Sequence, residues 1–121
     1  MTEWNPDDLA SLASKSEVQV AGRRKDGSPR TLVTIWQVVV DDQVYVRSWH
    51  GADGQWYKGV MRHGEGFMSW DGDPAPVTYI PDASRDDEID AAYVAKYGRN
   101  MYSDGMTNAQ ARATTLRVEP R

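Results

Sequence analysis

Four cationic side chains gather within eight residues near the start of the chain. Segment 23–30 reads RRKDGSPR. Its Asp-Gly pair and Pro29 predict a turn between two strands, because Asp-Gly favours hairpins and proline has no N–H for the sheet ladder. Charge in an exposed turn often serves only solubility. Arg30 is nevertheless a candidate for an anion site, because a guanidinium held at a strand start can form paired hydrogen bonds to phosphate or carboxylate.

A second group of candidate residues lies where a later predicted strand ends. A glycine loop follows that strand and leads to two adjacent aromatic residues. Glycine lets a flat group approach the backbone, aromatic side chains can border it, and a histidine can move a proton near neutral pH. Aromatic residues are more often core or dimer anchors than ring-stacking groups, and a single loop histidine often has no such role. The group comprises Arg47, Ser48, His50, Gly51, Trp56 and Tyr57.

The sequence lacks the residues that several classes of functional site require. There is no Cys, which excludes thiol nucleophiles, disulfides and zinc-thiolate sites. The two His do not have a His-x-x-x-His spacing, and no P-loop, dinucleotide fingerprint or Gly-x-Ser-x-Gly elbow is present. The acidic run 86–90 is typical of a helix N-terminus rather than of a calcium loop.

Length, composition and charge limit the class of protein. The 121 residues, 40% hydrophobic and 26% charged, predict one packed domain over 1–121. We see no signal peptide and no apolar run long enough to span a membrane, so we expect a cytoplasmic protein with no membrane partner. The net charge of −4 argues against a nucleic-acid partner. Residues 15–62 carry eight Lys/Arg and five Asp/Glu, whereas 63–105 carry three and nine, which is common on protein surfaces but also fits a pocket for a small anion.

The hydrophobic pattern predicts a mainly β protein with two helices. Segment 32–40 has apolar residues on both parities, which predicts burial on both faces, within a covered barrel or at a subunit interface, and favours a homodimer. Asn5 before Pro6 predicts the start of the first helix, and Ser84 and Gly98 mark the two ends of the second. The expected strands are 17–22, 32–40, 43–49, 77–80 and 112–118, with a hairpin over 58–70 and helices over 6–14 and 84–97.

The stretch 22–60 resembles the flavin-binding split-barrel proteins. Its basic turn ending in Gly-x-Pro-Arg, its hydrophobic hairpin, its glycine loop and its Trp-Tyr pair are similar to the branch of deazaflavin-dependent nitroreductases. Residues 4–120 also resemble a bacterial family known as a domain of unknown function. Asp26 and Gly59 differ from the nitroreductase branch, in which a small hydroxyl residue and an amide side chain are common at these places. The motifs shared with the bacterial family are Thr34 to Trp36, Tyr45 to Ser48, Trp56 with Tyr57, and Ala92 to Gly98.

The resemblance implies an α+β fold built on a six-stranded antiparallel Greek-key split barrel, usually a homodimer. It implies FMN or a deazaflavin as cofactor, with Lys25, Gly27 and Arg30 near its phosphate and Ser48, Gly51, Trp56 and Tyr57 around its ring. Arg47 and His50 complete the candidate cofactor-binding residues. Two functions stay open: a redox protein in which the cofactor carries the hydride chemistry, or a non-enzymatic dimeric small-ligand-binding or interaction module that has lost the cofactor. The expected ligand is a small anionic aromatic molecule, and the lack of a paired acid, base or nucleophile slightly favours the second function.

Overall fold

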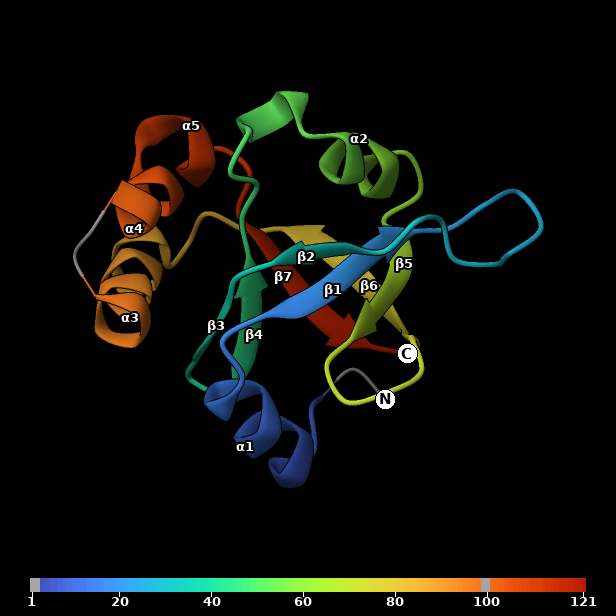
Figure 1. The fold of residues 1–121 in the computed structure, drawn as a ribbon, viewed down its shortest axis with the longest axis horizontal. Coiled ribbons are helices and arrows are strands. Elements are labelled where there is room, and N and C mark those ends of the chain that lie inside the picture. The colour runs from blue at the N-terminus through green and yellow to red at the C-terminus, as the bar shows by residue number, and fades with distance from the viewer. Residues whose placement is uncertain (1–2, 99–100) are drawn as a thin grey trace.

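Seven antiparallel strands form one sheet that curls into a split barrel (Figure 1). The computed structural model describes residues 3–98 and 101–121, and the side chains of all of these except 101–103. The strand order is β2-β1-β5-β6-β7-β4-β3, and every neighbouring pair is antiparallel. The strands are β1 (Val18–Gly22), β2 (Val33–Ile35), β3 (Gln37–Val40), β4 (Gln43–Val46), β5 (Glu65–Ser69), β6 (Ala75–Pro81) and β7 (Leu116–Pro120).

The two ends of the sheet are consecutive in the chain. β2 and β3 are separated only by Trp36, yet β2 pairs with β1 and β3 pairs with β4. The resemblance implies six strands and the sheet has seven. The predicted strand 32–40 is broken at Trp36 into β2 and β3. The hydroxyl of Tyr97 lies at the break, 3.3 Å from the N and 3.0 Å from the O of Gln37 and 2.7 Å from the O of Ser16.

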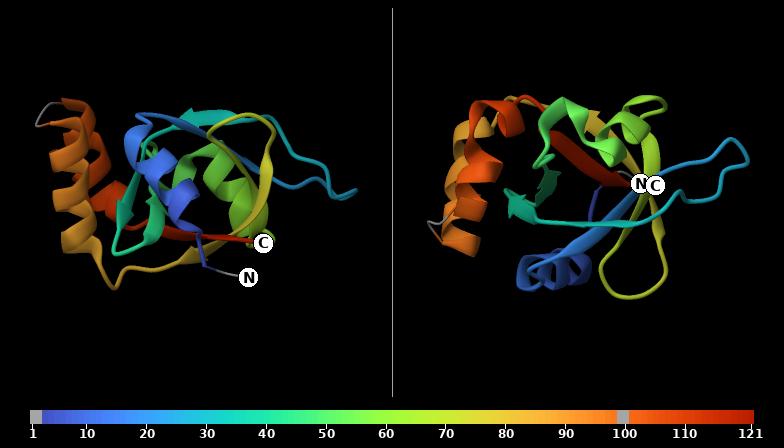
Figure 2. Two further views of the ribbon diagram at one scale, coloured as in Figure 1. Left: turned by 90° about the horizontal axis from the view of Figure 1, so that it is seen from below. Right: turned by 45° about the horizontal axis from the view of Figure 1, so that its top comes forward.

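The two long helices lie where the sequence predicts them. In α1 (Pro6–Ser14) the side chain of Asn5 accepts from the N–H of Asp8, and α3 (Asp86–Tyr97) ends at Gly98 with φ 79°. Ser84 does not cap α3 as predicted. Its N and Oγ both donate to Asp82 Oδ1, at 2.9 and 2.6 Å, so Ser84 belongs to a turn before the helix. Two short helices, α4 (Met101–Thr107) and α5 (Ala109–Arg112), lie beside α3 (Figures 1 and 2).

A short helix replaces half of the hairpin predicted over 58–70. After the 3-10 turn η1 (Gly51–Asp53), the chain forms α2 (Gln55–Met61), and only β5 is extended. A Cβ added to Gly22 on β1 would lie 3.1 Å from the carbonyl carbon of Gly59, so α2 packs directly on the strand backbone. Helix α2 covers one end of the barrel (Figure 1).

None of the helices in the described part of the chain is long and apolar enough to cross a membrane.

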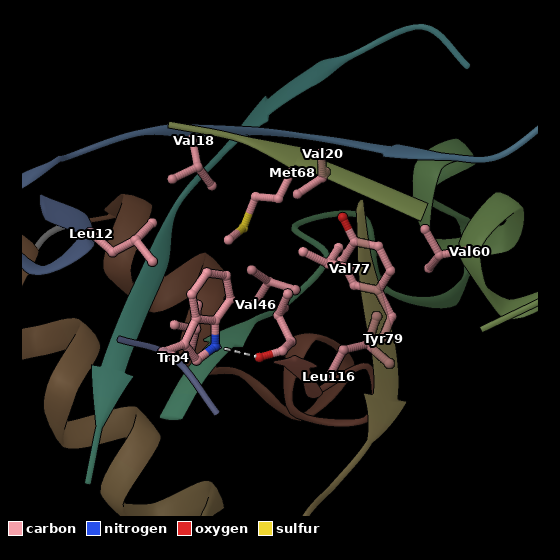
Figure 3. Close-up of a cluster of buried hydrophobic side chains, with 12 residues drawn as sticks. Trp4, Leu12, Val18, Val20, Val46, Val60, Met68, Val77, Tyr79 and Leu116 are labelled. Atoms are coloured by element: carbon pink, nitrogen blue, oxygen red, sulfur yellow. Dashed lines mark hydrogen bonds between the residues drawn. The ribbon is translucent and has the colours of Figure 1, made fainter. Parts of the chain in front are cut away.

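The barrel interior holds the main hydrophobic core (Figure 3). Trp4 is part of it, and its Nε1 donates to the O of Val118 on β7 at 2.8 Å. A second cluster lies outside the barrel, where Tyr93 of α3 packs on Val38 and Tyr45. Helix α3 thus covers the outer face of β3, which accounts for the apolar residues on both parities of that strand. The short strand β2 is more exposed than β3, and its Val33 is 37% exposed.

Candidate functional site

A cleft of about 270 Å³ lies between α2 and the first two strands. We call it the arginine cleft. Gln55, Gly59 and Arg62 line it from α2 and its end, because the spacing of four and three residues places them on one side of a helix. Gly59 lies against Gly22, so backbone atoms without side chains line this part of the cleft. The full lining is Gly22, Arg30, Thr31, Val33, Gln55, Trp56, Gly59 and Arg62.

Among the described residues, the two arginines of this cleft have no anionic partner. The N of Arg30 donates to the O of Gly22 at 3.0 Å, and its Nε donates to the O of Arg23 at 3.3 Å, which holds the side chain near the cleft. Within residues 3–98 and 104–121, neither Arg30 nor Arg62 forms an ion pair. Both side chains are exposed. Their terminal nitrogens are therefore available to an anion from solution.

One aromatic residue of the predicted Trp-Tyr pair lines the arginine cleft. Trp56 is partly buried, with its ring centroid 6.2 Å from that of Tyr57 and 6.5 Å from that of Tyr79. Tyr57 packs against the barrel core, as Trp56 does, but it is not among the described residues that line the cleft. Burial raises the pKa of Tyr79, whose hydroxyl donates to the O of Phe67 at 2.6 Å. These contacts hold Trp56 as a fixed wall of the cleft.

The cationic turn extends beyond the cleft. Segment 23–30 projects from the barrel as a long loop (Figure 1), with Lys25 exposed near its tip and Gly27 at φ 91°. The Asp26 carboxylate accepts from the Oγ and N of Ser28, at 2.6 and 3.0 Å, and these bonds lower the pKa of Asp26. Asp26 thus closes the turn. Neither Lys25 nor Gly27 lines the arginine cleft, and their role near a phosphate stays a prediction.

Arg47 lies in a different environment from Arg30. It is fully buried, and its guanidinium forms ion pairs with Asp86 and Asp90 of α3. It also donates to Thr115 Oγ1 at 3.0 Å and to the O of Met106 at 2.9 Å. A ligand would have to displace these bonds. Arg47 does not line the arginine cleft, and its role in cofactor binding stays a prediction.

The predicted ring-binding loop packs against the C-terminal helices. The N of Ser48 donates to Thr114 Oγ1 at 2.9 Å, and Gln110 of α5 donates to the O of His50 at 3.1 Å. Gly51 has φ 63°, and a Cβ there would lie 2.3 Å from the Gln110 side chain. None of the three loop residues lines the arginine cleft, so the structure does not bring them together with Arg30.

A second cavity, of about 340 Å³, lies in the seam of the barrel. We call it the seam cavity. It lies between β2 and the chain that follows β4, and two indole rings contribute to its walls. Its lining is Glu17, Thr34, Ile35, Trp36, Arg47, Trp49 and Met106.

Sequence reasoning missed some residues of both cavities. Arg62 was not a candidate, because the helix that directs it into the cleft was not predicted; the spacing of Gln55, Gly59 and Arg62 is the signal that could have found it. Trp36 belongs to a motif shared with the bacterial family. Glu17 has no local signal that separates it from other surface carboxylates.

Comparisons with known proteins agree with this fold. Residues 8–118 match the family described as "Uncharacterized protein conserved in bacteria (DUF2255)", which confirms the predicted bacterial family of unknown function. No curated protein matches the chain. Three solved structures are similar in fold at low sequence identity.

The heme storage protein HutZ from Vibrio cholerae has a TM-score of 0.66 and 12% identity, over 98% of this chain and 91% of that one. The conserved hypothetical protein Rv2991 from Mycobacterium tuberculosis has a TM-score of 0.61 and 15% identity, over 99% and 81%. An F420 reductase has a TM-score of 0.53 and 16% identity, over 97% and 94%. At such identities the likeness shows the fold alone.

Proposed function

The chain belongs to this bacterial family of uncharacterised proteins, and we propose that it binds a small anionic aromatic ligand in the arginine cleft. One observation carries the proposal: Arg30 and Arg62, two guanidinium groups that form no ion pair with any described residue, line one cleft that is partly glycine backbone. Arginine recognises phosphate and carboxylate by paired, charge-assisted hydrogen bonds. Glycine leaves room for close approach, and Trp56 offers a flat wall.

A flavin fits this cleft at its anionic end. Arg30 and Arg62 would hold the phosphate, and Trp56 would border the ring. A bound FMN or deazaflavin would supply hydride transfer. The flavin ring fits this cleft less well than the phosphate does, because Ser48, Gly51 and Tyr57 lie outside the cleft. The volume of the cleft, about 270 Å³, is also just below the range of about 300–1,000 Å³ that is usual for ligand pockets.

A second copy of the chain would complete the cleft. Val33, which lines it, is 37% exposed, and Met61, next to Arg62, is 43% exposed. Exposed large apolar residues at the edge of a ligand site favour a protein interface there. We propose a homodimer through this surface. In sedimentation, Met61→Asp is expected to shift the protein from dimer toward monomer; a wild-type protein that sediments as a monomer would refute the dimer.

The alternative is a binding module without a redox cofactor. The position of Ser48 against Thr114 and of Gly51 against α5, rather than at the cleft, favours it. The described residues of the single chain then offer a site for an anion and only one ring wall. Heme, which HutZ stores, is also a flat anionic molecule. Neither His50 nor His63 lines the arginine cleft, so the cleft presents no imidazole to a heme iron.

The test compares FMN with riboflavin, which has the same ring and no phosphate. Titration calorimetry is expected to show FMN binding more tightly, and Arg30→Ala or Arg62→Ala to weaken FMN at least about tenfold, since a charged hydrogen bond contributes about 1.5–3 kcal/mol. Lys58→Ala, an exposed cation on α2 outside the cleft, is the matched control and should bind FMN as the wild type does. Equal affinity for FMN and riboflavin, or unchanged binding in both arginine variants, would end the proposal.

Visible absorbance of the purified protein separates the two functions. A flavin spectrum that survives dialysis favours the redox protein. A colourless protein that binds pyrophosphate through Arg30 and Arg62, but neither FMN nor a deazaflavin, favours the binding module.

A further inference from the structure

We propose that the seam cavity is a second ligand site, which takes a small organic cation such as a quaternary ammonium. The site does not depend on the function proposed for the arginine cleft. The cavity lies on the other part of β2, with Thr34 and Ile35 on one side and Trp49 from the chain after β4 on the other. Met106 of α4 lines it as well.

Each of the two indole rings of the seam cavity packs against a neighbouring residue. Trp36 stacks on Tyr97, with ring centroids 3.8 Å apart and planes 4° apart. Trp49 lies against Gly105 of α4, where an added Cβ would be 2.3 Å from the indole ring. Trp49 is still 43% exposed and lines the cavity. Two supported indole rings therefore line one cavity, and indole is the aromatic group that attracts cations most strongly.

The charges around the seam cavity favour a cation. Glu17 lines it, and within residues 3–98 and 104–121 the exposed Glu17 carboxylate forms no ion pair. Burial raises the pKa of Tyr97 to about 12, and the charge of Glu17 adds to this rise. Among the described residues of the wall the one cation is Arg47, and Asp86 and Asp90 neutralise it.

Aromatic faces beside a carboxylate recognise ammonium groups, because the ring quadrupole and the negative charge both attract a cation that is weakly hydrated. A volume of about 340 Å³ is near the lower end for ligand pockets, so the cation must be small. Size and charge together make quaternary and alkylated ammonium compounds the expected class. The arginine cleft has the opposite charge and should not bind them.

The test uses choline and its neutral isostere 3,3-dimethylbutan-1-ol, measured by titration calorimetry. Choline is expected to bind at least about tenfold more tightly than the neutral alcohol. Trp49→Leu should weaken choline binding by about tenfold and Glu17→Gln by a smaller factor, with unchanged circular dichroism. Glu3→Gln, another exposed carboxylate outside the cavity, is the matched control.

Arg30→Ala should leave choline binding unchanged, so failure of the arginine cleft does not affect this result. Equal binding of choline and the neutral alcohol would overturn the proposal. So would full choline affinity in both Trp49→Leu and Glu17→Gln. Competition between FMN and choline would show that the two cavities form one site and would also overturn it. A change in sedimentation alone in Trp49→Leu would assign the cavity to a contact between copies instead.

Discussion

Two arginines that look alike in the sequence occupy opposite environments. Arg47 is fully buried between a strand end and α3, where Asp86 and Asp90 neutralise it. Arg30 is exposed at the edge of a cleft, and its hydrogen bonds within the described part of the chain go to backbone oxygens. Both lie near the end of a strand, so position along a strand does not separate a structural cation from a candidate binding one. The difference lies in their partners.

Those partners come from distant parts of the chain. The carboxylates of Asp86 and Asp90 lie 39 and 43 residues after Arg47. In the sequence these carboxylates predict the N-terminus of a helix, where negative charge stabilises α3 through the helix dipole. This local role gives no sign of their pairing with Arg47. Arg30 has no counterpart of this kind within the described residues. Charge pairing across the fold, rather than residue type, thus decides which guanidinium an external anion can reach.

Removal of Arg47 is expected to have the largest effect on stability. Arg47→Met leaves two carboxylates beside a buried site, and breaking such a pair costs roughly 3–5 kcal/mol of unfolding free energy. Urea denaturation measures the loss. Arg30→Ala is the control and should stay within about 0.5 kcal/mol of the wild type, as surface substitutions usually do. Equal losses of unfolding free energy in Arg47→Met and Arg30→Ala would contradict the difference between the environments of the two arginines.

The glycine contact allows the cleft to be altered without a change of charge. Gly22→Ala should cost about 1–3 kcal/mol, because its Cβ would meet the Gly59 backbone at 3.1 Å. Gly59→Ala should stabilise α2 by up to about 1 kcal/mol, since its Cβ has only the Arg30 side chain, at 4.0 Å, as a near neighbour. The new methyl group would enter the arginine cleft and weaken FMN binding.

Thermal and calorimetric measurements on both glycine variants check this pair of expectations. A Gly59→Ala protein that is more stable and binds FMN unchanged would show that the ligand does not reach this surface. A stable Gly22→Ala protein would contradict the close packing of α2 on β1.

Lys96 is intermediate between the two arginines, and its effect on stability should depend on pH. Its Nζ donates to the O of Leu12 and of Gln37, at 3.2 and 3.1 Å, and within residues 3–98 and 104–121 no carboxylate pairs with it. Partial burial without a counter-ion lowers its pKa to about 8. The unfolded chain, with a lysine pKa near 10.4, binds more protons above pH 8, so the Lys96 contribution to stability should rise with pH from about 8 to about 10.

The measurement is the difference in unfolding free energy between the wild type and Lys96→Met at about pH 7 and about pH 10. The variant removes this one titration and leaves the others in place. The unfolding free energy of the wild type minus that of the variant should increase with pH. A decrease in this value between about pH 7 and about pH 10 would contradict the sign of the pKa shift.

Local patterns predict much of the fold but not its long-range contacts. The Asp41-Asp42 turn, with φ of 51° and 63°, connects β3 and β4 as the hairpin signal indicates. The helix α2 is not predictable in this way, because Gly59 lowers helix propensity and the reason for a glycine is its contact with Gly22. The break at Trp36 depends on Tyr97, a residue 61 positions later in the sequence.

The candidate site shows the same limit. Arg30 and Trp56 line one cleft, as the sequence suggests. Ser48 and Gly51 do not join them, because Thr114 and Gln110, more than 55 residues away in sequence, hold their loop on the other side. Such contacts have no signature in a local pattern.

The place of β7 in the sheet has a consequence for biosynthesis. This strand, residues Leu116–Pro120, lies between β6 and β4, and its Val118 accepts the hydrogen bond from Trp4. Until these residues leave the ribosome, the nascent chain keeps two strands with open edges, which are prone to pair with other molecules. Closure of the barrel must therefore follow the emergence of β7 from the ribosome.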